Sequence, residues 1–345
     1  MNGVETTDQV TAPAAPVFPD RLLNCLKAPG GTDTDTLVQK DRQLFCPSTG
    51  EIFDYAEEIP SLFAPSPGEG TEVTDKIKSF YEENPFPSYE GVEEFGELVN
   101  KGMQNRFSAD LLEAIGFNKL ILECGCGTGQ LSHFLQLNNN HVLGIDMSLA
   151  SLRLAIEHKM RNQLSRSAFA QMNIFNLALK DDSFDVVISH GVLHHTFDAR
   201  RAFSHIVRKV KPGGIVMVGL YNRPARLPTW IRSKLINVFG SKIDYVVRSR
   251  IHDARKADIW IKDQYFNPHE TWHSIDEVME WFDENDVEFL NCSPPILDTD
   301  GEAAETLFAE TSAGTGFQRT VTQLSWLTTI AREGALFDVI GRRKS

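Results

Sequence analysis

The segment 120–131 constrains the fold more than any other part of the sequence. An apolar run there ends in Glu123, and Gly125, Gly127 and Gly129 follow at two-residue spacing. Glycine has no Cβ, so this turn can take a positive φ and let a ligand lie against the backbone. The pattern predicts a buried strand, a tight turn and then a helix whose free N–H groups face that ligand.

Asp146 adds a second acid at the same predicted sheet edge. It ends the apolar run 141–145 and follows Gly129 by seventeen residues. An acid at the tip of the second strand of such a unit accepts hydrogen bonds from both hydroxyls of a ribose. The two segments together indicate a nucleoside-containing cofactor at the carboxyl edge of a parallel sheet.

The spacing and the first acid discriminate between nucleoside cofactors. The dinucleotide fingerprint is G-x-G-x-x-G, whereas this turn has G-x-G-x-G with Glu123 two residues before the first glycine. A carboxylate there would repel a pyrophosphate, but it suits the positively charged amino group of S-adenosylmethionine, which has no phosphate. A glycine turn that only packs a helix on a strand would explain the glycines but neither acid.

With these features the sequence resembles the class I S-adenosylmethionine-dependent methyltransferases. Segment 170–177 is similar to their third-strand motif, with Asn173 in place of the acid that contacts adenine. Segments 181–196 and 210–220 are similar to their fourth strand with its following loop and to the turn into their fifth strand. The resemblance covers about residues 75–222 well and the last hundred or so residues more loosely. It implies an α/β fold: a doubly wound, Rossmann-like, seven-stranded, mostly parallel sheet whose last strand is antiparallel.

The resemblance also implies which side chains surround the cofactor. Glu123 would hold the amino group, Asp146 the ribose, and Met147 would pack on the adenine ring. A helix before the glycine turn would lie over the cofactor with an aromatic residue facing it, and Phe80, Tyr81 and Tyr89 are the candidates. The expected cofactor-binding set is Glu123, Gly125, Cys126, Gly127, Gly129, Gln130, Asp146, Met147, Asn173, Ile174, His190 and Tyr81.

Length and periodicity predict four consecutive parts of the 345 residues. Residues 1–20 are expected to be a disordered tail, because they are rich in Pro, Ala and Thr and precede the first basic residue. Residues 21–64 form a small separate unit, and 70–116 form a helical extension over the cofactor. Residues 117–345 are the methyltransferase domain, with an inserted helical cap over 222–273.

The unit at 21–64 is similar to the short zinc ribbons that precede some methyltransferases. Such ribbons bind zinc through two C-x-x-C pairs. Here Ala28 and Thr49 stand where the second cysteines after Cys25 and Cys46 would be. Two thiolates do not close a tetrahedral site, so we predict a degenerate ribbon without metal. The simpler alternative is that both cysteines are small buried side chains.

The composition limits the cell compartment and the kinds of binding partner that we expect for this protein. The sequence is 41% hydrophobic, which suffices for an ordinary globular core, and its formal charge of -13 disfavours general binding to nucleic acid. No apolar run approaches the roughly 18 residues of a membrane span. The first twenty residues lack the basic start and apolar block of a signal peptide. The five cysteines are odd in number and scattered, so a reduced, cytoplasmic protein is expected.

The predicted cap differs in charge from the rest of the chain. Residues 222–262 hold ten Lys and Arg against three Asp, with Trp230, Phe239, Tyr245 and Trp260 between them. Inserts of this kind shape substrate pockets, so the composition predicts an anionic or aromatic acceptor. The alternative is a solvated helical surface whose basic face has no partner.

Methyl transfer needs orientation and, for some acceptors, a base. Histidine titrates near neutral pH and can take a proton. Five residues are candidates, at the ends of the fourth and fifth strands and of the cap: His194, His195, Tyr221, His269 and His273. The His-Glu-x-x-His spelling at 269–273 also matches a zinc-protease motif, but Pro268 precedes it, Ser274 caps the next helix, and no long helix is predicted to carry both histidines.

The sequence therefore favours an enzyme that transfers a methyl group from S-adenosylmethionine to O or N of a small molecule. A second hypothesis is an RNA or tRNA methyltransferase. The ribbon-like unit and the basic cap favour it, and the negative net charge of the whole chain disfavours it. A non-catalytic, cofactor-binding regulatory subunit is a third reading, and the intact acids and glycines oppose it.

Overall fold

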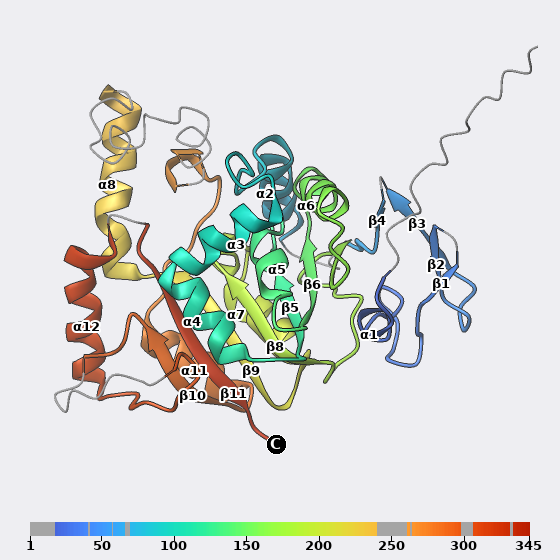
Figure 1. Ribbon diagram of the computed structural model, residues 1–345. Helices are drawn as coiled ribbons and strands as arrows, with labels where there is room; N and C mark the ends of the chain where they lie inside the picture. Colours follow the sequence, from blue (N-terminus) through green and yellow to red (C-terminus); the bar gives the residue numbers. More distant parts are fainter. Residues whose placement is uncertain are drawn as a thin grey trace, which may run out of the picture.

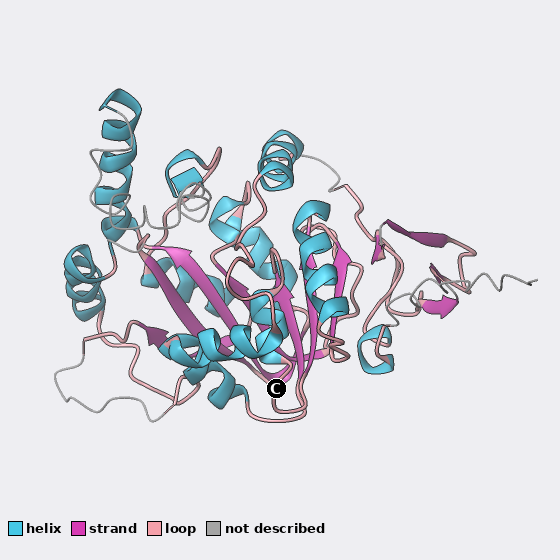
Figure 2. Ribbon diagram, turned by 45° about the horizontal axis from the view of Figure 1, so that its top comes forward, coloured by secondary structure: helices cyan, strands magenta, loops and turns pink. Residues whose placement is uncertain are grey.

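The structure is a computed structural model that describes residues 18–40, 42–56, 58–65, 70–239, 261–262, 264–297, 306–331 and 334–345. A seven-stranded sheet forms its centre, and helices cover both faces of that sheet (Figures 1 and 2). A second, four-stranded sheet lies beside it and comes from the N-terminal part of the chain.

The central sheet has the strand order β10-β11-β9-β8-β5-β6-β7. Its strands are β5 (Leu120–Cys124), β6 (His141–Asp146), β7 (Ser167–Gln171), β8 (Phe184–His190), β9 (Val210–Tyr221), β10 (Val287–Ser293) and β11 (Leu336–Arg343). All pairings between β7 and β9 are parallel, and β11 is antiparallel to both β9 and β10. The predicted doubly wound sheet with an antiparallel last strand is confirmed.

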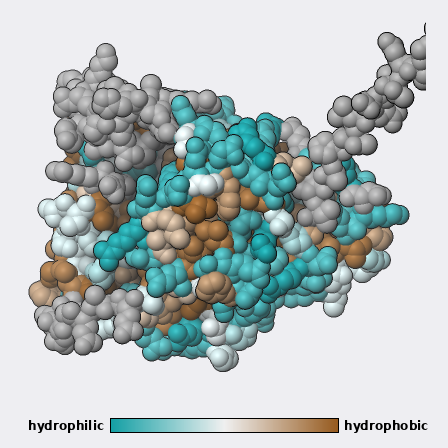
Figure 3. Space-filling view, viewed as in Figure 1, coloured by the Kyte–Doolittle hydropathy of each residue, from teal (hydrophilic) through white to brown (hydrophobic). Residues whose placement is uncertain are grey.

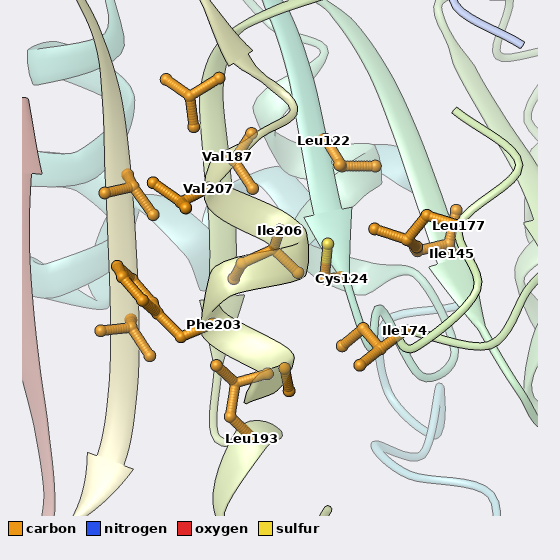
Figure 4. Packing of buried hydrophobic residues seen from close by; sticks show 14 of the residues in the cluster. Leu122, Cys124, Ile145, Ile174, Leu177, Val187, Leu193, Phe203, Ile206 and Val207 are labelled. Carbon is orange, nitrogen blue, oxygen red and sulfur yellow. The ribbon is translucent and has the colours of Figure 1, made fainter. Parts of the chain in front are cut away.

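Alternate side chains of the buried strands enter different cores, because successive residues of a strand point to opposite faces. Ile121 packs with α4 (Arg106–Ile115) and α5 (Gln130–Leu135). Leu122 belongs to the larger cluster on the other face, with α7 (Ala199–Val207) and α11 (Ile275–Glu284). Figure 4 shows the second cluster, in which Phe203, Ile206 and Val207 of α7 lie among strand residues.

Residues 70–116 are mostly helical, with a non-helical segment over 84–94 that begins at Asn84-Pro-Phe-Pro. They form α2 (Thr71–Glu83), α3 (Phe95–Gln104) and α4. The Glu82 carboxylate accepts hydrogen bonds from the backbone N–H groups of Leu149 (2.8 Å) and Ala150 (3.0 Å), at the start of α6 (Leu149–Arg161). A carboxylate is stabilising at a helix N-terminus, so this contact ties α2 to the carboxyl edge of the sheet.

The N-terminal unit is a small sheet in the order β1-β2-β3-β4. It consists of α1 (Asp20–Leu23), β1 (Val38–Lys40), β2 (Gln43–Phe45), β3 (Ile52–Ala56) and β4 (Ile59–Pro60). Cys25 and Cys46 are both buried thiols, and no group of three or more metal-ligating side chains occurs among the described residues. A parallel bridge from Ser61 to Gln171 joins the unit to the β7 edge.

Two local features depart from what their sequences suggest. Pro212 and the two glycines after it lie inside β9 and do not end the preceding helix, since α7 ends at Val207. At the start of α11, the Ser-x-x-Glu pattern of a capping box is only half formed. Ser274 accepts a hydrogen bond from the Glu277 N–H (3.2 Å), whereas the Glu277 side chain pairs with His273 and Arg223 instead of the cap backbone.

The cap begins with α8 (Arg223–Phe239), which packs against α12 (Gly316–Thr329). Residues 240–260 lie outside the described part, and so do the predictions that concern Tyr245 and Trp260. This stretch also holds five of the ten Lys and Arg of the cap and all three of its Asp. Residues 1–17 of the predicted tail also lie outside the described part of the chain. Within the described ranges, no helix has the length and apolar character needed to cross a bilayer.

Candidate active site

The glycine turn forms as predicted between β5 and α5. Its three glycines have positive φ, and Gly127 (φ +52°) has no room for a side chain, because a Cβ there would lie 2.3 Å from the Phe86 carbonyl oxygen. The Thr128 N–H donates to the same oxygen at 3.2 Å. The loop after α2 is therefore packed directly on the turn, where only glycine permits so close an approach.

A cavity of about 490 Å³ lies over this turn and the carboxyl ends of β5, β6 and β8. Helices α2 and α3 supply its other wall, and apolar side chains are visible at the surface over α3 and α4 in Figure 3. Eleven of the twelve expected cofactor-binding residues line it: Glu123, Gly125, Cys126, Gly127, Gln130, Asp146, Met147, Asn173, Ile174, His190 and Tyr81. Gly129 does not line it and instead caps α5 with φ +78°.

Two carboxylates mark one end of the cavity. Asp146 accepts hydrogen bonds from the backbone N–H groups of Gly127 (2.8 Å) and Ser148 (2.9 Å), so it closes the turn and faces the cavity. Glu123 is 6% exposed and accepts a hydrogen bond from the Ser132 hydroxyl. Burial raises the pKa of Glu123 to about 7. A buried carboxylate that is costly to ionise alone gains from a cationic ligand, as the amino group of S-adenosylmethionine would provide.

The other end of the cavity is aromatic, and the cap contributes a lining residue there. Tyr81, His195 and Tyr221 line it together with Gln264. Gln264 donates to the Tyr221 hydroxyl (2.9 Å), and Asn267 donates to the Tyr81 hydroxyl (3.0 Å). The C-terminal part of the cap thus fixes two phenol groups at the cavity wall.

Of the aromatic candidates that precede the turn, only Tyr81 lines the cavity. Phe80 packs edge-on against Tyr81, with ring centroids 5.2 Å apart. Tyr89 points elsewhere, since its hydroxyl donates to the Thr128 carbonyl (2.8 Å) and its ring stacks on His158.

Three of the five base candidates do not reach the cavity. His194 is fully buried and stacks on the back of Tyr221, with ring centroids 3.8 Å apart. Burial lowers the pKa of His194 well below its ordinary value, which fits a packing role. His273 bonds to Thr271 (2.7 Å) and Glu277 (2.9 Å), and neither it nor His269 lines the cavity.

The His-Glu-x-x-His spelling lies in a loop and not in a helix, so its two histidines do not share a helical face. Its glutamate, Glu270, pairs with Arg226 at 2.7 Å. This pairing explains the motif as part of a structural cluster.

Sequence reasoning missed several residues of the site. Lys101 on α3 lines the cavity and donates to Gln130 at 2.9 Å. Arg226 is buried behind Tyr221, with its guanidinium carbon 3.7 Å from the ring centroid. Phe86 and Gln264 also line the cavity. Only the position of Arg226 shortly after the fifth strand could have drawn attention to it.

Comparison with known proteins agrees with this geometry. Residues 117–286 match the family model described as a methyltransferase domain. Ubiquinone biosynthesis O-methyltransferase of Cronobacter sakazakii is 29% identical over 175 residues, which are 50% of this chain and 63% of that protein. Phosphoethanolamine N-methyltransferase of Triticum aestivum is 29% identical over 148 residues, which are 42% of this chain and 26% of that protein.

The chain thus spans less than two thirds of the length of either relative. Among solved structures, phosphoethanolamine N-methyltransferase 2 of Haemonchus contortus in complex with S-adenosyl-L-methionine has 17% identity and a TM-score of 0.45, over 78% of this chain and 60% of that one. The strand order and the glycine turn with its two acids agree with the match of residues 117–286 to a methyltransferase domain.

Proposed function

We propose that this protein transfers a methyl group from S-adenosylmethionine to an oxygen or nitrogen of a small aromatic acceptor. The observation that carries the proposal is one cavity with two unlike ends. Glu123 and Asp146 line it from β5 and β6 and mark the first end. Tyr221 at the end of β9, with His195 and Tyr81 in ring contact, marks the second. A cationic nucleoside fits the first end, and a planar acceptor fits the second.

The residues at the first end fit the cofactor chemically. Asp146 would accept from the ribose hydroxyls and Glu123 would hold the amino group, while Asn173 and Met147 would contact adenine. When bound, S-adenosylmethionine supplies a methyl group that is already activated for displacement. The protein then has to orient the acceptor, exclude water and, where the acceptor carries a proton, remove it.

The described part of the cap supports an aromatic acceptor more than an anionic one. Arg223 pairs with Glu277 (3.1 Å) and Arg226 pairs with Glu270 (2.7 Å). Arg232 donates to the Thr229 hydroxyl and the Ala331 carbonyl, both at 2.9 Å. These cations therefore serve the packing of the cap, whereas the phenol rings and Phe86 face the cavity.

Methyl-label transfer tests this proposal. The protein would be incubated with methyl-labelled S-adenosylmethionine and a panel of phenols, catechols and aromatic amines, with phosphoethanolamine as the non-aromatic member. We expect label in at least one aromatic acceptor with the wild type and none with Asp146→Ala. Label in phosphoethanolamine alone would contradict the aromatic acceptor, and no label in any acceptor would contradict the proposed activity.

A further inference from the structure

His190, Gly219 and Asp338 lie side by side on three neighbouring strands of the central sheet. His190 ends β8 and is in register with Gly219 of β9, which is in register with Asp338 of β11. The His190 Nδ1 and Asp338 Oδ1 atoms are 2.7 Å apart. The pair therefore bridges over the glycine that separates the two side chains.

Gly219 is the reason that this bridge can form. A Cβ at that position would lie 2.5 Å from Asp338 Oδ1 and 2.8 Å from His190 Nδ1. Glycine inside a strand weakens it and commonly marks a place where other groups approach closely. Here the groups that approach are the carboxylate and the imidazole.

The surroundings of His190 favour a ring that can hold a proton. Asp338 is 5% exposed, and Glu123 lies on the neighbouring strand β5. Burial alone would lower the pKa of His190, but Asp338 and Glu123 outweigh it and raise that pKa above its ordinary value. Phe107 of α4 stacks on the ring at 5.0 Å, and Lys101 of α3 is the charged group that lines the same cavity from the helical wall.

The strand order places His190 beside the reacting end of the cofactor. The expected adenine, ribose and amino contacts lie on β7, β6 and β5 or directly after them, in that spatial order. The next strand is β8, so its terminal residue follows the amino contact at the cavity wall. Tyr221, at the end of β9, follows in turn and belongs to the acceptor end.

We propose that His190, oriented by Asp338, is the base that takes the proton from the acceptor. In the balanced step, the acceptor oxygen or nitrogen bonds to the methyl carbon and the carbon–sulfur electron pair stays on sulfur. The acceptor's O–H or N–H proton passes to His190 Nε2. Asp338 is a positioning residue, which fixes Nδ1 as the donor and stabilises the imidazolium that forms. The acceptor class is therefore a hydroxyl or an amine with a proton to lose.

His195 is the other histidine that lines the cavity and could take the proton. Its hydrogen-bond partner is a backbone carbonyl, whereas that of His190 is a carboxylate. The His195 Nδ1 lies 2.8 Å from the carbonyl oxygen of His269. A carbonyl orients an imidazole, but it stabilises the protonated ring less than a carboxylate does. The pair with Asp338 therefore favours His190 as the group that holds the proton after transfer.

This inference rests on the proposed function, but it can be tested without a known acceptor. S-adenosylmethionine carries a sulfonium charge that S-adenosylhomocysteine lacks. A protonated His190 beside the sulfonium weakens binding of the first ligand only. Calorimetric titration of both ligands at about pH 5.5 and about pH 8.5 measures the ratio of their dissociation constants. Glu123, which titrates in the same range, faces a group that both ligands share.

We expect the ratio of the S-adenosylmethionine Kd to the S-adenosylhomocysteine Kd to be about tenfold larger at the lower pH, from charges at an effective dielectric of about 20. In His190→Gln this increase should vanish. In Asp338→Asn the pH at which the ratio of dissociation constants rises should be lower, because the His190 imidazolium loses its counter-charge. His141→Gln, outside the cavity lining, is the matched control and should behave as the wild type.

Retained S-adenosylhomocysteine binding shows that each variant is folded. The same pH dependence in His190→Gln as in the wild type would overturn the assignment of His190 while leaving the proposed function intact. Absence of binding of either ligand to the wild type would instead overturn the proposed function, and this inference with it.

Discussion

Replacing Asp146 with alanine is expected to weaken S-adenosylmethionine binding at least about a hundredfold. The carboxylate would lose two charge-assisted hydrogen bonds to the ribose, each worth about 1.5–3 kcal/mol. It also accepts from the N–H groups of Gly127 (2.8 Å) and Ser148 (2.9 Å), so the same change loosens the glycine turn. Calorimetric titration with S-adenosylmethionine measures the loss.

The control for this prediction is Asp54→Ala. Asp54 is an exposed acid of β3 that accepts from Gln43 at 2.7 Å and does not line the cavity. Its removal should leave the affinity unchanged within about twofold. Wild-type affinity in Asp146→Ala would mean that the cofactor does not use the second-strand acid.

Replacing Arg226 with methionine is expected to lower the free energy of unfolding by about 3–5 kcal/mol, because breaking a buried ion pair leaves the partner uncompensated. The Arg226 side chain is 1% exposed and pairs with Glu270. It also donates to the Gln264 carbonyl (2.9 Å) and the Gly334 carbonyl (3.0 Å). The residue thus joins α8, the end of the cap and the approach to β11. Urea denaturation measures the change.

Two variants control this experiment. Lys234→Met removes an exposed cation of the same helix, 5.6 Å from the Trp230 ring centroid, and should change stability by less than about 0.5 kcal/mol. In Arg226→Met combined with Glu270→Gln, about 1–3 kcal/mol should be regained, since the unpaired carboxylate is gone. An Arg226→Met protein as stable as the Lys234→Met protein would contradict the structural role of the cluster.

Features fixed by neighbouring residues could be predicted from the sequence. The strand, turn and helix at 120–135 follow from an apolar run and three glycines. Asp198 caps α7 by accepting a hydrogen bond from the Arg201 N–H at 2.9 Å. Its position directly before residues with helical apolar spacing indicates this role. The alternation of strands and helices predicts a parallel sheet, and the parallel pairings from β7 to β9 agree.

Features that join distant residues could not be predicted in this way. The contact of His190 with Asp338 spans 148 positions, and that of Arg226 with Gly334 spans 108. No local period marks either pair. The register of β8, β9 and β11 brings the first pair together, and the packing of α8 against the loop before β11 brings the second together. A glycine near the end of β9, Gly219, was the only local signal of the first pair.

Adjacent residues with the same chemistry were also beyond sequence reasoning. His194 and His195 occupy one short 3-10 turn, Leu193–His195. That turn directs His195 to the cavity and buries His194 under Tyr221. Which histidine faces the ligand depends on the rotation of a single turn, and the sequence does not encode that rotation in any simple pattern.

A crystal structure of the protein with S-adenosylhomocysteine tests the central claim most directly. We predict that the ribose hydroxyls lie within hydrogen-bonding distance of Asp146, the amino group lies beside Glu123, and the sulfur faces His190 and Tyr221. A ligand whose adenine lies at the Tyr221 end, or one bound outside this cavity, would contradict the cofactor orientation on which the proposed chemistry depends.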